Sequence, residues 1–85
     1  MDSLHSVIGI AATNRACEVK VLETGTSREI TKEPVQGKFS ISYLASGPFP
    51  AKVDISAYCD GTMVKELKAI APRDRGAVDL GILPP

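Results

Sequence analysis

With 85 residues, the chain is long enough for one hydrophobic core and too short for two, so a single domain over residues 1–85 is expected. Ten basic and ten acidic residues cancel and form no run of like charge, which argues against nucleic acid or an anionic membrane as a partner. Apolar residues make up 44% of the chain and charged residues 24%, which is typical of a folded globular protein and excludes a disordered one.

The N-terminal part holds the longest apolar stretch, residues 7–12, which is far shorter than the roughly 20 residues that cross a bilayer. No membrane insertion is therefore expected. The stretch is also shorter than the apolar region of a secretory signal and lacks its basic start. The compartment stays open between the cytoplasm and export with the signal peptide missing. Residues 1–6 are expected to fray, and residues 7–12 to form an additional edge strand.

Alternation of apolar and polar residues predicts strands in the rest of the chain. In Cys17–Glu23 the first, third and fifth residues share one side, and the same period recurs over 38–44 and 51–59. The dipeptide Asp60-Gly61 follows directly and predicts a hairpin whose strands pair antiparallel. Less regular patterns predict the remaining strands at 28–32, Thr62–Ile70 and Ala77–Leu83.

Six or seven short strands, separated by turn residues and without any helical period, predict an all-β fold, a sandwich or small barrel. The side of each strand that carries the apolar residues should face the core. The expected core residues are Val19, Val21, Phe39, Ile41, Val53, Ile55, Leu80 and Ile82.

The two cysteines, Cys17 and Cys59, match no spacing of a zinc, CxxC or haem site. Both share the apolar side of their strands, so both should face the core, where a reactive thiolate is not expected. They are either two packed thiols or a disulfide. A disulfide requires that the two strands be neighbours or face each other across the sandwich near one end.

Candidate catalytic groups are sparse. The lone histidine, His5, lies in the segment that is expected to fray, and the carboxylates do not cluster along the sequence. One histidine and two distant cysteines are too few for a structural metal site, and no glycine pattern of a nucleotide-binding loop is present. We therefore expect no cofactor and no enzymatic activity.

Two aromatic residues are candidates for contact with a ligand or partner. Phe49 lies between Pro48 and Pro50, which stiffen the loop on both sides; it either presents a binding anchor or plugs the end of the sandwich. Tyr58 lies on the polar side of its strand and is either exposed for recognition or packed across the strands against Met63 or Lys65.

Four groups of apolar and glycine residues follow one another between residues 16 and 83. They are Val19 and Val21; Gly37, Phe39 and Ile41; Val53, Ile55, Ala57 and Gly61; and Asp79, Leu80, Gly81 and Leu83. In this order they resemble the transthyretin-like or carboxypeptidase regulatory-like β-sandwich family. The resemblance implies a seven-stranded antiparallel Greek-key sandwich that acts as an accessory, stabilising or adhesive module. The Tyr-Arg-Gly-Ser signature of the family's hydroxyisourate hydrolases does not occur in the chain.

The leading functional expectation is a non-catalytic interaction or structural module. Its partner would be another protein or a second copy, bound through exposed sheet edges. The alternative is a small-ligand or carbohydrate-binding domain that uses the aromatic residues Phe49 and Tyr58.

Overall fold

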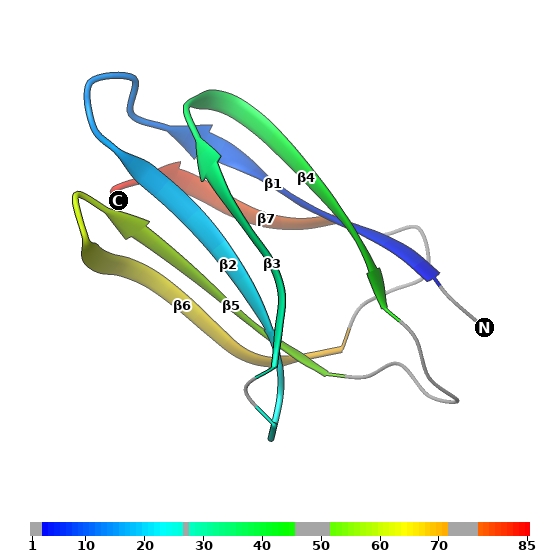
Figure 1. The fold of residues 1–85 in the computed structure, drawn as a ribbon. Helices are drawn as coiled ribbons and strands as arrows, with labels where there is room; N and C mark the ends of the chain where they lie inside the picture. Colours follow the sequence, from blue (N-terminus) through cyan, green and yellow to red (C-terminus); the bar gives the residue numbers. More distant parts are fainter. Residues whose placement is uncertain (1–2, 27, 46–51, 72–76) are drawn as a thin grey trace.

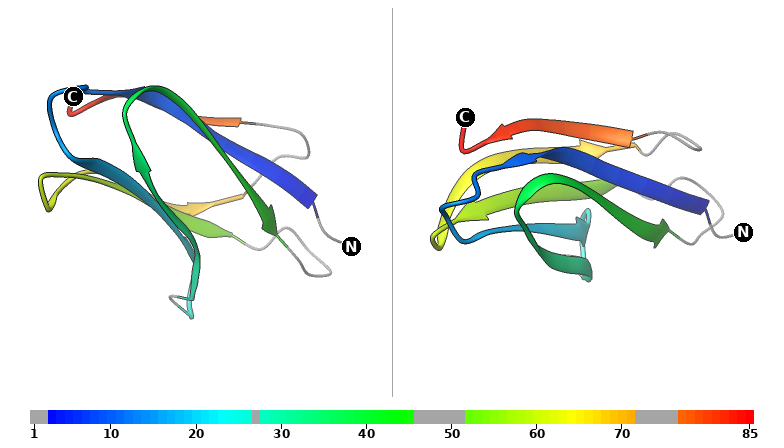
Figure 2. Two further views of the ribbon diagram at one scale, coloured as in Figure 1. Left: turned by 45° about the horizontal axis from the view of Figure 1, so that its top comes forward. Right: turned by 90° about the horizontal axis from the view of Figure 1, so that it is seen from above.

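The computed structural model describes residues 3–26, 28–45, 52–71 and 77–85. In these residues seven strands form two sheets, one above the other (Figure 1), and two further views show the layers from the side (Figure 2). The predicted all-β sandwich is confirmed. The strands are β1 (Ser3–Ala11), β2 (Cys17–Glu23), β3 (Glu29–Val35), β4 (Gly37–Ala45), β5 (Val53–Cys59), β6 (Thr62–Ile70) and β7 (Ala77–Leu83).

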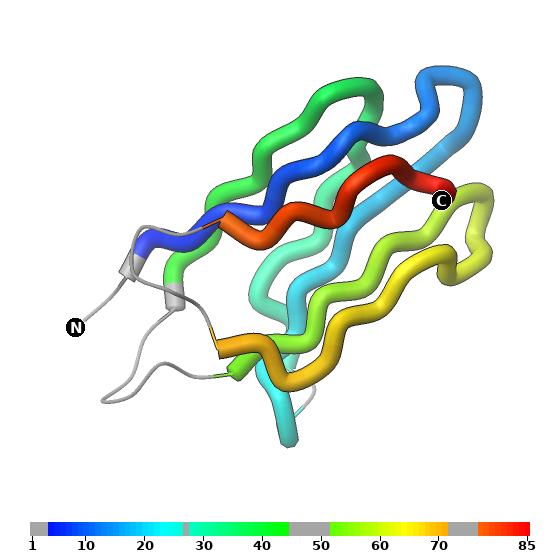
Figure 3. The backbone as a smooth tube through the Cα atoms, turned by 180° about the vertical axis from the view of Figure 1, so that it is seen from behind, coloured from blue at the N-terminus to red at the C-terminus, as the bar shows by residue number. Residues whose placement is uncertain are grey.

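The strand order is β4-β1-β7 in one sheet and β3-β2-β5-β6 in the other. The chain therefore crosses between the sheets after β1, β3, β4 and β6, as the tube through the backbone shows (Figure 3). Neighbouring strands pair antiparallel except β1 and β7, which are parallel. Such a parallel pair requires a long connection, and here the other five strands lie between β1 and β7 along the chain.

The core lies between the sheets and is filled by alternate residues of the strands, since successive side chains of a strand point to opposite faces. Five predicted core residues are fully buried. The side chains of Val19, Val21, Val53 and Ile55 have 0% exposure, and that of Leu80 has 1%. The predicted residue Ile41 is buried as well, and the remaining buried apolar residues are Val7, Ala11, Cys17, Val35, Tyr43, Ala57, Cys59 and Leu83.

The prediction that Ile82 belongs to the core is wrong, because its side chain is 67% exposed. A bulge in β7 causes the difference: Ile8 pairs with Asp79 and Ile10 pairs with Ile82, so β7 holds one residue more than β1 between these points. Gly81 takes a positive φ of 72° there, and its N–H donates to the Asp79 carboxylate at 2.7 Å. After the bulge the inward and outward positions of β7 are exchanged, so Leu83 points into the core and Ile82 points outward.

The expectation of an edge strand over 7–12 is also corrected; of the segment that was expected to fray, residues 1–2 lie outside the described residues. Strand β1 begins at Ser3 and is the central strand of its sheet, paired with β4 on one side and β7 on the other. Hydrogen bonding on both sides holds a strand more firmly than an edge does, and the His5 side chain is accordingly buried at 5% exposure.

One turn and one strand show how local sequence determines the fold. Asp60 and Gly61 have φ values of 53° and 80°, so the β5–β6 hairpin has the two left-handed residues of the turn that Asp-Gly predicts. Strand β3 is longer than predicted and includes Pro34, which an edge strand tolerates because the missing N–H is not needed on its free side.

Phe39 is partly buried and packs against the core, where full burial was expected. Its ring lies over Gly9, the residue opposite it on β1. A Cβ added at Gly9 would lie 2.8 Å from the ring and 3.0 Å from the carbonyl oxygen of Gly81, so a residue without a side chain is needed there.

Candidate functional site

The outer side of the three-stranded sheet carries five large apolar side chains, which we name the apolar face: Leu4, Ile8, Ile10, Leu44 and Ile82. Leu4 and Leu44 lie opposite each other on β1 and β4 and are 58% and 62% exposed. Ile10 and Ile82 form the same kind of pair on β1 and β7 at 52% and 67%. The Ser6–Ser42 pair lies between the first of these pairs and Ile8. Several large apolar side chains exposed on one side of a sheet indicate an interaction site.

A groove of about 390 Å³ lies in the apolar face. It is lined by Ile8, Ile10 and Ile82 and reaches the ring of Phe39 at Gly9 and Gly81. Two of the lining residues, Gly9 and Gly81, have no side chain, which leaves room for the groove. The same two glycines make space for the Phe39 ring and form the β7 bulge.

Charge is sparse on this side of the sheet. On the described strands, the outward positions carry one cation, Lys38 on β4, and one anion, Asp79 on β7. Three further outward positions are serines, Ser6 on β1 and Ser40 and Ser42 on β4. The two opposite charges thus lie on the two edge strands, on either side of the apolar residues of β1.

The outer side of the four-stranded sheet has a different character. Glu18 and Lys32 form an ion pair at 4.0 Å between β2 and β3. Lys20 on β2 places its ammonium 5.5 Å from the centre of the Tyr58 ring on β5. Charged side chains that pair with one another and with an aromatic ring are typical of a solvated surface, which makes the apolar face the exceptional side of the molecule.

Of the two aromatic candidates, Phe49 lies outside the described residues. Tyr58 is partly buried, lies under Lys20 and is paired with Met63 on the neighbouring strand. The structure does not bring Tyr58 together with the apolar face, since the two lie on different sheets.

His5 lies in the core opposite Tyr43, and the centres of the two rings are 5.7 Å apart. The hydroxyl of Tyr43 is buried and has no hydrogen-bond partner within the described parts of the chain. Burial removes water from the phenol and raises its pKa above the ordinary value of 10.0, so Tyr43 stays neutral. His5 and Tyr43 together fill the part of the core that lies against β1 and β4.

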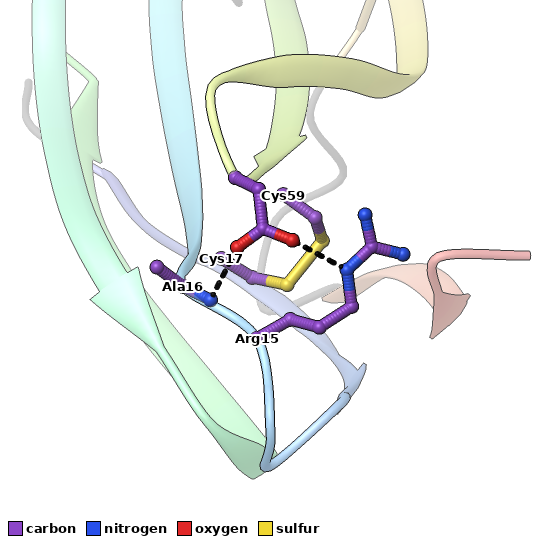
Figure 4. A network of polar contacts seen from close by, with 5 residues as sticks. Arg15, Ala16, Cys17 and Cys59 are labelled. Atoms are coloured by element: carbon purple, nitrogen blue, oxygen red, sulfur yellow. Dashed lines mark hydrogen bonds and ion pairs between the residues drawn. A yellow bond between two sulfur atoms is a disulfide. The ribbon is translucent and has the colours of Figure 1, made fainter.

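Cys17 and Cys59 form a disulfide, which is one of the two arrangements left open by the sequence (Figure 4). A polar cluster closes the same end of the sheet. The Asp60 carboxylate accepts hydrogen bonds from Arg15 Nε at 2.7 Å and from the backbone N–H of Ala16 at 3.1 Å. These bonds, that of Arg15 first, hold the pKa of Asp60 below its ordinary value.

Two further carboxyl groups have lowered pKa values for similar reasons. Asp54 accepts from the N–H of Ala69 at 2.9 Å and from the Thr24 hydroxyl at 2.8 Å. Glu23 accepts from the hydroxyl of Thr26 and the guanidinium of Arg28. All three carboxylates lie at strand ends or bulges and join neighbouring segments. They therefore stabilise the fold.

Within the residues described, no three histidine, cysteine, aspartate or glutamate side chains gather where a metal ion would bind. The described residues also contain no helix that is long and apolar enough to cross a membrane. No family model matches the chain, and comparisons with curated proteins and with solved structures also find no match.

The sequence of β1 carries a signal for the apolar face that alternation alone does not reveal. In β1 both sides of the strand are apolar, with Val7 on the inner side and Leu4, Ile8 and Ile10 on the outer side. A strand with this pattern is typically covered on both faces, so it indicates either a buried position or an interaction surface.

Proposed function

We propose that this protein is a non-catalytic structural module that assembles with a second copy of itself through the apolar face. The observation that carries the proposal is the exposure of four large apolar side chains, each more than half accessible, on one side of one sheet. Burial of such a surface stabilises an assembly by roughly 25 cal/mol for each Å² removed from water. An accessory role is also what the resemblance of residues 16–83 to transthyretin-like sandwiches implies.

The charges on this side favour a second copy as the occupant. In an interface with two-fold symmetry the same surface is used twice, so each charge needs its opposite on that same surface. Lys38 and Asp79 meet this requirement, since they lie on opposite edge strands of one face. Two sheets that stack face to face can set Lys38 of each copy beside Asp79 of the other.

Size-exclusion chromatography with light scattering over a range of concentrations tests the proposal. The double variant Ile10→Ser, Ile82→Ser removes apolar surface without touching the core, so it should fold and should associate less than the unchanged chain. Met63→Ser is the matched control, because Met63 is 43% exposed but lies on β6 of the other sheet. A chain that stays monomeric at high concentration, or a control as effective as the double variant, contradicts the proposal.

The charge pair gives a second arm of the same experiment. Lys38→Glu places a carboxylate against Asp79 of the second copy and should weaken association, most strongly at low salt. Lys65→Glu is a suitable control, because Lys65 lies on the other sheet. Equal effects of the two variants would contradict the proposed stacking of the faces.

A further inference from the structure

Three of the four edge strands are interrupted in ways that prevent a further strand from pairing with them. Strand β3 contains Pro34 and a register shift opposite Val21 and Leu22. Strand β6 has two register shifts, and Ala69 takes a positive φ of 54° in it. Strand β7 has the bulge at Gly81. Bulges, prolines and charges on an edge are the usual means by which proteins avoid edge-to-edge association.

Strand β4 has no proline and no register shift, and its one residue with a positive φ, Gly37 at 63°, is its first. Its nine residues pair with β1 without interruption, from Ala45 opposite Ser3 to Gly37 opposite Ala11. It contains no proline, and Lys38 is its single charged residue. No described strand pairs with its other side. A long, regular edge of this kind presents a row of backbone N–H and C=O groups that can accept another strand.

The central five residues and the two ends of β4 match their own reverse in residue type. Around Ile41 at the centre, Ser40 mirrors Ser42, and Phe39 mirrors Tyr43. The small residues Gly37 and Ala45 at the ends also correspond, whereas Lys38 and Leu44 differ in type. An antiparallel copy of the same strand therefore brings like residues together at every position except Lys38 and Leu44.

We infer that β4 pairs antiparallel with β4 of a second copy, with Ile41 opposite Ile41, so that two three-stranded sheets become one continuous six-stranded sheet. Ser40 then faces Ser42 of the second copy, and Phe39 faces Tyr43 of the second copy. Serine–serine and aromatic pairs of this kind stabilise neighbouring strands. The methylene stem of Lys38 covers Leu44 of the second copy and leaves its ammonium in water.

The inference rests on the proposed function in that it names the same partner, but it uses a different surface. In the proposed function the apolar face contacts the apolar face of the second copy, whereas in this inference the edge of β4 pairs with the β4 edge of the second copy. Stacked sheets lie about 10 Å apart, whereas a disulfide needs Cα atoms within about 7 Å, so a cross-link between copies distinguishes the two contacts.

The test mixes equal amounts of Ser40→Cys and Ser42→Cys before mild oxidation, followed by non-reducing electrophoresis and mass spectrometry. Both positions are exposed, so neither change disturbs the core. The expected product is a cross-link between position 40 of one copy and position 42 of the other, in large excess over 40–40 and 42–42 products. The residues of those like pairs are two positions out of register and too far apart to bond.

Ser6→Cys mixed with Ser42→Cys is the control, because Ser6 points to the same side from the central strand β1 and cannot reach an edge-paired copy. Hydrogen exchange gives a second measurement, in which β4 amides should become more protected as the protein concentration rises. Absence of the 40–42 product, equal amounts of all products, or an equally cross-linked control would overturn the inference. Repeating the mixture in the Ile10→Ser, Ile82→Ser background separates the two proposals: the 40–42 product persists there if the edge contact is independent of the apolar face.

Discussion

Cys17 lies directly opposite Cys59 on the neighbouring strand, and their Cα atoms are 4.0 Å apart. The disulfide therefore joins β2 and β5 within one sheet and does not bridge the two layers. Asp60, which follows Cys59, and Arg15, two residues before Cys17, add a 2.7 Å ion pair at the same end. The β5–β6 hairpin is thus attached to the start of β2 by covalent, ionic and backbone bonds together.

Loss of this disulfide should destabilise the protein by about 4 kcal/mol, since it closes a loop between residues 42 positions apart and restricts the unfolded chain. Urea unfolding of the unchanged chain and of the Cys17→Ala, Cys59→Ala double variant measures the difference. Thiol titration of the unchanged chain in denaturant should find no free thiol. Two free thiols in protein purified without reductant would contradict the disulfide.

Two isoleucines that the alternation pattern placed together in the core should behave differently. Ile55→Ala should cost roughly 2 to 5 kcal/mol, because the side chain is fully buried and its removal leaves a cavity. Ile82→Ala should change the stability of the isolated chain by less than about 0.5 kcal/mol, because the side chain is exposed. Unfolding in denaturant at low protein concentration measures both, and similar losses would contradict the position of the β7 bulge.

The behaviour of Ile82 shows where prediction from sequence ends. Alternation predicts which residues of a strand share a side, and in β2 it predicts Val19 and Val21 correctly. It assumes an unbroken period, and the bulge between Asp79 and Ile82 breaks that period. Gly81 and an aspartate two residues before it are compatible with a bulge, but only the pairing with β1 determines that one forms.

The candidate site was predictable only in part. Phe39 and Ile41 were expected on the core side of one strand, and sheet edges were expected to bind a partner. Which strand has a free and regular edge depends on the strand order of both sheets. That order results from contacts between distant segments, such as β1 with β7, and no local pattern reports it.

A side chain at position 9 should destabilise the fold. Gly9→Ala places a Cβ 2.8 Å from the Phe39 ring and 3.0 Å from a backbone oxygen, and crowding of this kind typically costs 1 to 3 kcal/mol. Combining it with Phe39→Leu should recover part of the loss, because the smaller side chain gives way. A double-mutant cycle on the free energy of unfolding measures this coupling. Additive effects would show that Phe39 does not pack over Gly9.

Acid should destabilise the protein through Asp54 and Asp60. Their pKa values are lowered in the folded chain from the ordinary value of 3.8, by the N–H of Ala69 for Asp54 and by Arg15 for Asp60. The unfolded chain therefore binds protons more readily than the folded chain. The stabilisation is complete above the ordinary pKa and is lost as the pH falls through the lowered values.

The double variant Asp54→Asn, Asp60→Asn should show a flatter decline of the free energy of unfolding over this acidic range than the unchanged chain. Asparagine tolerates the positive φ of position 60, so the turn is kept while the charge is removed. Glu33→Gln is the control, because Glu33 is exposed on β3 and takes part in neither cluster. Urea unfolding at a series of pH values measures the three profiles. An equally steep decline in the double variant would show that these carboxylates do not join their neighbouring segments in solution.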